Sequence, residues 1–552
     1  MTLDGFLGLI ALFIAFYAIV SPVTRLRVQL HLAIQMPLAF LSVTLVLYFE
    51  FFSLLGQPCW PASKQLCYWL TFPADNSFTP QQAAFLVVFA WMSLALTLNH
   101  LLKSGPRALP TIGKIVQTLL YDHRFAELLD FIRPHLRLID ETARRQRLLQ
   151  KVHDWLANAD RFRRQKYPAI GPVEEEVAAE AKSTFATRGY EGFRRNIRWF
   201  AVFIPAQRKV QAGAENIARM LLRSEEFRRF VVTMRPDMAA DLMAINLHLR
   251  YDFADKVFRD LIADSGSRLY QEIEQNQNLA GDGGYVIPEQ NKLLHFLFDD
   301  ANVARRLGAW KPVGDYVINS IRAGAKNGYT EYLNDRSDNF DEERWRDSTF
   351  VGIRYFDIMV HAAMRQGVPD HMWLFYLPLF VKELEEVYDS SGPEIDTTAE
   401  FPTRNARLIY EAFHVMGNWV RAIEYLDAAS PHAAIAPMGE FSSCAIPVDA
   451  GVVLGNAMVT VVLSPRIGDT FAAYIHDCVL HHISALSRDG LEGRMRAILI
   501  RTVVAGGNRG PDARYGEKLK TFLAMTDHVL RGQVRDYVEA VTTTFPDPRT
   551  SD

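Results

Sequence analysis

Histidine and aspartate side chains gather between residues 476 and 482, in a segment whose apolar spacing predicts a helix. An adjacent pair, His476 and Asp477, together with a distant His and Asp, can ligate divalent metals in phosphohydrolases. His414 before the pair and Asp527 after it could complete such a set. Neutral imidazole and carboxylate would hold the metal, which would lower the pKa of a bound water for attack on phosphate. The pattern offers a metal site as an alternative only, because a His-Asp dipeptide also occurs by chance.

Other catalytic patterns are missing from the sequence. It contains no G-x-x-x-x-G-K-[ST] phosphate loop, no G-x-G-x-x-G, no H-E-x-x-H and no G-x-S-x-G. An acidic stretch at 335–343 does not have the spacing of a calcium loop, and neighbouring arginines neutralise much of it. The sequence therefore predicts no cofactor and favours a protein that is not an enzyme.

A basic segment is the second chemical feature. From Arg133 to Lys209 there are 17 basic and 9 acidic residues, a local excess of 8. Arginines beside an aromatic run suit contact with anionic lipid headgroups, and phosphates of nucleic acid are a competing use. A helix with a basic solvated face explains the same charge and is favoured over both. The candidate anion-contacting residues are Arg194, Arg195, Arg198, Trp199, Arg208 and Lys209.

Three stretches of the first 102 residues carry no charged side chain, namely 5–23, 28–49 and 81–102. Each reaches the roughly 18–20 apolar residues that a helix needs to cross a bilayer. Residues 1–102 are therefore predicted as a three-helix transmembrane domain with spans at about 5–23, 28–49 and 81–102. The basic residues Arg25, Arg27, Lys103 and Arg107 flank these stretches. The positive-inside rule then places the amino terminus outside and the remaining chain in the cytoplasm of an inner-membrane, multi-pass protein.

The cysteines fit this topology. Cys59 and Cys67 lie in the loop that the topology places outside, where an oxidising compartment would allow a disulfide between them. Two unpaired interfacial cysteines are the alternative. Cys444 and Cys478 belong to the part assigned to the cytoplasm and are expected to be reduced.

Beyond a linker at 103–112, the chain is predicted to be helical almost throughout, because apolar residues recur every three or four positions, for example at 349–365, 404–427 and 517–543. The weak strand candidates are 285–288 and parts of 440–464. Residues 119–138 and 221–240 are similar: in each, a leucine is followed six residues later by Phe125 or Phe227 and fifteen later by a proline. A looser third copy begins at Leu297. Repeated helical hairpins bury their faces by stacking on neighbours. The prediction is an all-α protein, with a helical-repeat domain at 113–330 and a second helical domain at 331–552, forming an irregular solenoid or several bundles.

Three functional hypotheses follow. The first is a membrane-tethered interaction or sensor protein whose helical body binds a partner, with a protein partner or a second copy of the chain expected. The second is an oligomeric membrane effector, which forms a pore or perturbs the bilayer as bacterial stress or antiviral effectors do. The third is a metal-dependent phosphohydrolase using the His-Asp cluster. A net charge of −3 gives no indication of the partner.

Overall fold

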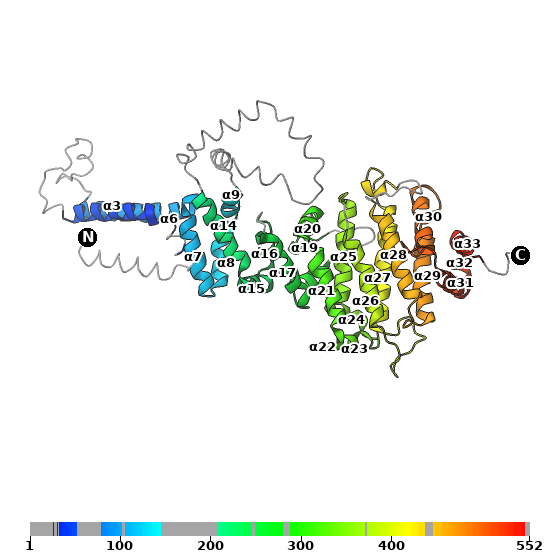
Figure 1. Ribbon diagram of the computed structural model, residues 1–552. Coiled ribbons are helices and arrows are strands. Elements are labelled where there is room, and N and C mark those ends of the chain that lie inside the picture. The colour runs from blue at the N-terminus through cyan, green and yellow to red at the C-terminus, as the bar shows by residue number, and fades with distance from the viewer. Residues whose placement is uncertain are drawn as a thin grey trace, which may run out of the picture. The chain divides into compact units, whose positions relative to one another are not determined.

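A computed structural model describes residues 32–51, 79–101, 105–144, 208–245, 249–279, 287–369, 372–435 and 445–546, with residues 26 and 30. Every regular element in these ranges is a helix, so the predicted all-α class is confirmed (Figure 1). The two segments considered as weak strands in the sequence, 285–288 and 440–464, form no strand where they are described, and most of the second is helix α28 (Ile446–Val462).

The chain divides into two compact units. Unit 1 comprises Met1–Phe227 and Ile245–Leu247, and unit 2 comprises Arg228–Ala244 and His248–Asp552. The domain boundary expected after residue 330 falls inside helix α23 (Tyr329–Leu333), which belongs to unit 2.

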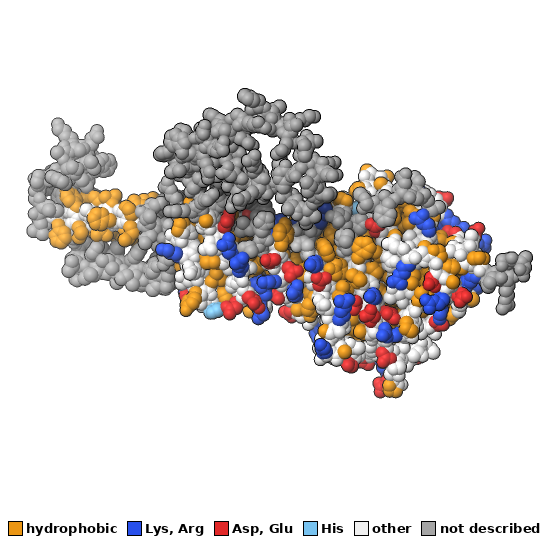
Figure 2. All heavy atoms as spheres, viewed as in Figure 1, with side chains coloured by type: hydrophobic (Ala, Val, Ile, Leu, Met, Phe, Trp, Pro, Cys, Tyr) orange, Lys and Arg blue, Asp and Glu red, His pale blue; other side chains and the backbone are white. Residues whose placement is uncertain are grey.

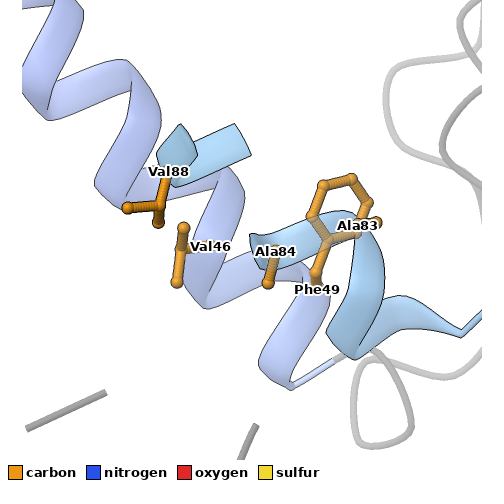
Figure 3. Packing of buried hydrophobic residues seen from close by; sticks show 5 residues of the cluster. All are labelled: Val46, Phe49, Ala83, Ala84 and Val88. Carbon is orange, nitrogen blue, oxygen red and sulfur yellow. The ribbon is translucent and has the colours of Figure 1, made fainter. Parts of the chain in front are cut away.

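In unit 1, helices α3 (Leu32–Glu50) and α6 (Pro80–Leu101) pack against each other. Figure 3 shows the contact, in which Val46 and Phe49 of α3 meet Ala83, Ala84 and Val88 of α6. The start of α6 is fixed by a reciprocal cap: the Thr79 amide donates to Gln82 Oε1 at 2.9 Å, and the Gln82 amide to Thr79 Oγ1 at 3.3 Å.

The predicted transmembrane domain needs correction. Within the described ranges, no helix combines the length and the apolar character that a membrane crossing requires. Of the three predicted spans, 5–23 lies outside the described residues, 28–49 is described mainly from residue 32, and 81–102 corresponds to α6. Polar residues and a proline interrupt the apolar runs: α3 contains Gln35, Pro37 and Thr44, and the first residue of α6, Pro80, is followed by two glutamines. The finding contradicts the predicted inner-membrane, multi-pass localisation.

The surface of the α3–α6 pair is apolar nonetheless. Phe40 is 75% exposed, Phe85 56% and Phe89 58%, and Figure 2 shows apolar side chains covering α3 on the viewed face. Contiguous exposed apolar surface of this kind typically marks a contact site on a protein.

The helices that follow realise the first two copies of the sequence repeat. Helix α7 packs on α14, and the equivalent phenylalanines of the two copies, Phe125 and Phe227, lie with ring centroids 5.9 Å apart. In each copy the second helix ends before the proline, which then stands in the first turn of the next helix. Pro236, for example, is the first residue of α16, where its missing N–H costs no hydrogen bond. The bounds in unit 1 are α7 (Leu109–Tyr121), α8 (Phe125–Ile132), α9 (Leu136–Arg144) and α14 (Arg208–Arg223). Helix α15 (Glu225–Met234) passes into unit 2 after Phe227, and α16 (Pro236–Met243) lies in unit 2.

Unit 2 continues as helices that stack in two layers. In one layer α25 packs on α27 and α27 on α29; in the other α21 packs on α26, α26 on α28 and α28 on α30 (Figure 1). The larger helices are α17 (Leu249–Ala263), α18 (Arg268–Leu279), α21 (Trp310–Arg322), α25 (Ser348–Arg365), α26 (Tyr376–Glu386), α27 (Arg404–Arg421), α29 (Asp469–Ala485), α30 (Gly490–Val504), α31 (Ala513–Met525) and α33 (Arg535–Thr544). The shorter ones are α19 (Lys292–Phe298), α20 (Ala301–Leu307), α22 (Gly324–Asn327), α24 (Phe340–Glu343) and α32 (His528–Gln533).

Side-chain caps fix where several of these helices begin. Asp347 accepts hydrogen bonds from the amides of Thr349 and Phe350 at 2.7 and 2.9 Å, so α25 starts at Ser348. Thr403 caps α27 and Asp512 caps α31 in the same way. A glycine then allows one close packing contact: a Cβ on Gly417 of α27 would overlap the imidazole ring of His482 on α29. The side chain of His482 therefore fills the space that Gly417 leaves.

Candidate functional site

The structure does not bring the four candidate metal ligands together. His476 and His482 are six residues apart on α29, which at about 100° per residue puts them on different sides of the helix. His414 lies beside His482, with ring centroids 5.5 Å apart. His476 instead contacts the helix on the other side of α29, where its Nε2 lies 3.1 Å from the hydroxyl of Tyr537.

The two aspartates of the set have structural partners. Asp477 accepts a hydrogen bond from Thr526 Oγ1 at 2.7 Å, and Asp527 caps α32 by accepting from the Val529 amide at 2.8 Å. Burial lowers the pKa of His476, while Asp477 opposes that shift. No group of three or more His, Cys, Asp or Glu side chains suited to a metal ion occurs in the described part of the chain.

The other residues singled out in the sequence are placed as follows. Cys59 and Cys67, and the basic aromatic segment with Arg194, Arg195, Arg198 and Trp199, lie outside the described residues. Arg208 and Lys209 are the first two residues of α14. The disulfide and the anion contacts therefore stay predictions.

A cluster that the sequence did not reveal lines one side of α25, α27 and α29. We call it the polar seam. At its centre Arg354 donates to Glu411 Oε2 at 2.5 Å, and Arg407 lies 3.6 Å from the other oxygen of the same carboxylate. Asp357 accepts a hydrogen bond from the indole of Trp419 at 3.1 Å. Its members are Arg354, Asp357, His361, Arg407, Glu411, His414, Cys478 and His482.

Burial favours the uncharged forms of three side chains of the seam, His414, Cys478 and His482, next to its ion pairs. It lowers the pKa of His414, and it lowers that of His482 to about 3, assisted by repulsion from His414 and Arg421. Burial likewise raises the pKa of the Cys478 thiol to about 12, far from a reactive thiolate. Arg354 and Glu411 are 14% and 6% exposed. The seam is thus a largely buried network in which the chain supplies its own counter-charges.

An open cleft near the end of unit 2 has the opposite character. The cleft, which we call the α30–α33 cleft, has a volume of about 760 Å³, a size common among binding sites. Small and aliphatic side chains of its lining, which we call the floor, include Ala497, Ile500 and Val504 of α30 and Ala540 of α33. The lining also contains the buried Arg496. The charged lining residues that are at least partly exposed, which we call the rim, are Arg488, Arg501, Arg535, Asp536 and Glu539.

Arg496 holds the two walls of this cleft together. It is 3% exposed, and its guanidinium donates to both carboxylate oxygens of Asp536 at 2.6 and 2.8 Å. It also donates to the carbonyl oxygens of Ile483, Leu486 and Gln533. The hydrogen bonds from Arg496 to the carboxylate, together with the positive charge of Arg496, hold the pKa of Asp536 below its usual value. Because α30 and α33 are joined by this buried fork, the cleft has a defined width.

The sequence does contain a signal for this site that the pattern search missed. Between Leu486 and Pro546 there are ten Lys or Arg and seven Asp or Glu residues, an excess of three positive charges in a chain whose net charge is −3. Two of the acidic residues, Asp512 and Asp527, are occupied as helix caps. A count of charges along the last helices would have pointed to this region.

Comparison of the chain with protein-family models, with curated proteins and with solved structures finds no match. The functional argument therefore depends on the geometry of the chain itself.

Proposed function

We propose that this chain is a non-catalytic interaction protein, an irregular helical solenoid whose second unit binds a protein partner in the α30–α33 cleft. One observation carries the proposal: an open cleft of about 760 Å³, apolar at the floor and charged at the rim, lies beside the last helices of a two-layer stack. Stacked helical arrays bury a continuous core and leave extended surfaces that bind other macromolecules. That link between fold and use is an analogy, and the cleft supplies the specific site.

The size and lining of the cleft fit a macromolecular contact. Its apolar floor offers area that a partner can remove from water, which is the main favourable contribution to association. The surrounding charged rim is the usual arrangement of a protein interface. The bidentate contact of the buried Arg496 with Asp536 keeps the floor preformed, which lowers the entropy lost on binding.

A photo-crosslinking experiment tests the proposal. A photoreactive amino acid replaces Ala497, which is exposed on the cleft floor, and in a matched control it replaces Ala524, which is exposed on α31 away from the cleft. Irradiation of cells that produce the full chain should yield a discrete cross-linked product from position 497 and none from position 524. Equal cross-linking from the two positions, or none from position 497, would count against the proposed function.

A second candidate function, self-association, is favoured by a different observation. The α3–α6 pair exposes Phe40, Phe85 and Phe89, and large exposed apolar patches often mark contacts between chains. The molar mass of the full chain, measured by light scattering, should exceed that of one copy and return to it when all three are replaced by serine. A monomeric wild-type chain would exclude this candidate.

A further inference from the structure

The floor of the α30–α33 cleft follows one face of a helix. Gly493, Ala497, Ile500 and Val504 line the cleft from α30 at spacings of four, three and four residues. That stripe extends over about 16 Å, or three helical turns. Ala540 faces the cleft from α33. Small side chains at a helix surface allow another helix to approach closely, since the distance between helix axes depends on the side chains at the contact.

The rim carries more positive than negative charge, and most of its arginines form no ion pair within the part of the chain that the structure describes. Arg501 and Arg535 are exposed, and neither takes part in an ion pair within the described ranges. Among the described residues, Arg488 donates to the Gln533 carbonyl at 3.0 Å and forms no ion pair, so no described carboxylate compensates its charge. Glu539 is the one rim carboxylate that Arg496 does not hold. The rim therefore carries three uncompensated positive charges and one negative charge.

The guanidinium groups define the chemistry of the complementary surface. Arginine presents a planar fork of N–H donors that matches a carboxylate with two parallel hydrogen bonds. A ligand that fills an apolar floor of helical length and meets arginines at the rim needs apolar side chains on one face and carboxylates beside them. An amphipathic helix with Glu or Asp next to its apolar stripe has this arrangement.

We infer that the α30–α33 cleft binds an acidic amphipathic helix of a protein partner, which lies along the stripe from Gly493 to Val504 with its carboxylates on Arg501 and Arg535. The inference depends on the proposed function, because it names the kind of partner segment that the cleft accepts. Charge complementarity selects this occupant: the bound helix neutralises arginines that the chain itself leaves unpaired.

A direct binding measurement on the full chain tests the inference. The probe is a fluorescent amphipathic peptide of about five helical turns, with Leu and Ala on one face and Glu beside them, and the reference peptide has Gln in place of each Glu. The wild-type chain should bind the Glu peptide at least about tenfold more tightly than the Gln peptide, with a difference that shrinks in high salt. Equal affinity for the two peptides would overturn the inference.

Variants of the protein assign the binding to the cleft. The double substitution Arg501→Glu with Arg535→Glu should weaken binding of the Glu peptide by roughly tenfold or more and should favour a peptide with Lys in place of Glu. The control substitutes Arg509 and Arg514, two exposed arginines outside the cleft lining, with Glu. The control should change affinity by less than about twofold, because it alters net charge equally without touching the rim. Equal losses in the two double variants would place the binding elsewhere.

Other occupants give different results. Displacement of the Glu peptide by inorganic pyrophosphate, at a pyrophosphate concentration below that of the peptide, would identify a phosphate site and overturn the inference. A wild-type dimer that the Arg501→Glu and Arg535→Glu substitutions convert to a monomer would make the occupant a second copy. Failure of the inference is also distinct from failure of the proposed function: a cross-link from position 497 that the double substitution leaves unchanged supports the function and contradicts the acidic helix.

Discussion

The polar seam and the α30–α33 cleft both contain arginines, yet the two regions treat those charges differently. In the seam, Arg354 and Arg407 share the carboxylate of Glu411, and Arg407 also lies 4.3 Å from the ring centre of Phe401. In the cleft, Arg501 and Arg535 face solvent with no ion pair among the described residues. Charges that the chain pairs with itself hold its helices together, whereas unpaired charges at an open cleft can be paired by a ligand.

The largest test of this difference removes the carboxylate at the centre of the seam. Glu411→Ala should lower the free energy of unfolding by about 3 kcal/mol, because it removes the carboxylate that is hydrogen-bonded to the buried guanidinium of Arg354 and leaves only Asp357, at 3.6 Å. Urea unfolding followed by circular dichroism measures the change. The matched substitution Glu539→Ala, at the exposed rim of the cleft, should have an effect of less than about 0.5 kcal/mol. Similar losses in the two variants would remove the distinction between the regions.

A second substitution tests how tightly the seam is packed. Gly417→Ala should destabilise the fold by about 1–3 kcal/mol, since its new Cβ would overlap the ring of His482 and force that side chain out of position. Combining Gly417→Ala with His482→Ala should cost less than the sum of the two single changes, because the smaller side chain leaves room for the methyl group. Strict additivity in this double-mutant cycle would show that the two residues are not in contact.

The pH dependence of stability tests the buried histidines. Burial lowers the folded-state pKa of His482 to about 3, below the unfolded value of about 6.5, so the unfolded chain binds more protons between those limits. His482 should therefore lower the free energy of unfolding by up to about 1.4 kcal/mol per pH unit as the pH falls below about 6.5. The measured slope between pH 6.5 and pH 4.5 should decrease in His482→Gln, and should be unchanged in the exposed neighbour variant His481→Gln. A slope that is the same in both variants would contradict the assignment.

The sequence alone supports much of the fold and little of the site. Apolar spacing predicted helices at 349–365 and 404–427, and the structure has α25 (Ser348–Arg365) and α27 (Arg404–Arg421). It predicted one helix at 517–543 where three occur, because Asp527 caps a new helix after the extended backbone at Thr526. The transmembrane prediction took apolar length as sufficient, although the described helices α3 and α6 bury Val46 and Val88 against each other.

Long-range packing explains why the site was harder to predict. His414 and His476 were grouped by residue type, but which helix packs on each side of α29 depends on contacts that no local pattern encodes. In the structure His482 contacts His414 of α27, whereas His476 contacts Tyr537 of α33. The cleft likewise joins residues about forty positions apart in the sequence, such as Arg496 and Asp536. Their contact in the folded chain is needed to recognise the cleft.

The smallest expected effect on stability gives the sharpest form of the comparison. Arg501→Glu combined with Arg535→Glu should change the free energy of unfolding by less than about 0.5 kcal/mol for each substitution, because both side chains are exposed and neither supports a packing contact or ion pair of the described fold. Urea unfolding at two salt concentrations measures it, and a large loss would mean that the rim arginines stabilise the chain as the seam arginines do. Preserved stability together with altered binding would separate the two regions, since charges that serve a ligand can be reversed without cost to the fold, whereas charges that hold helices together cannot.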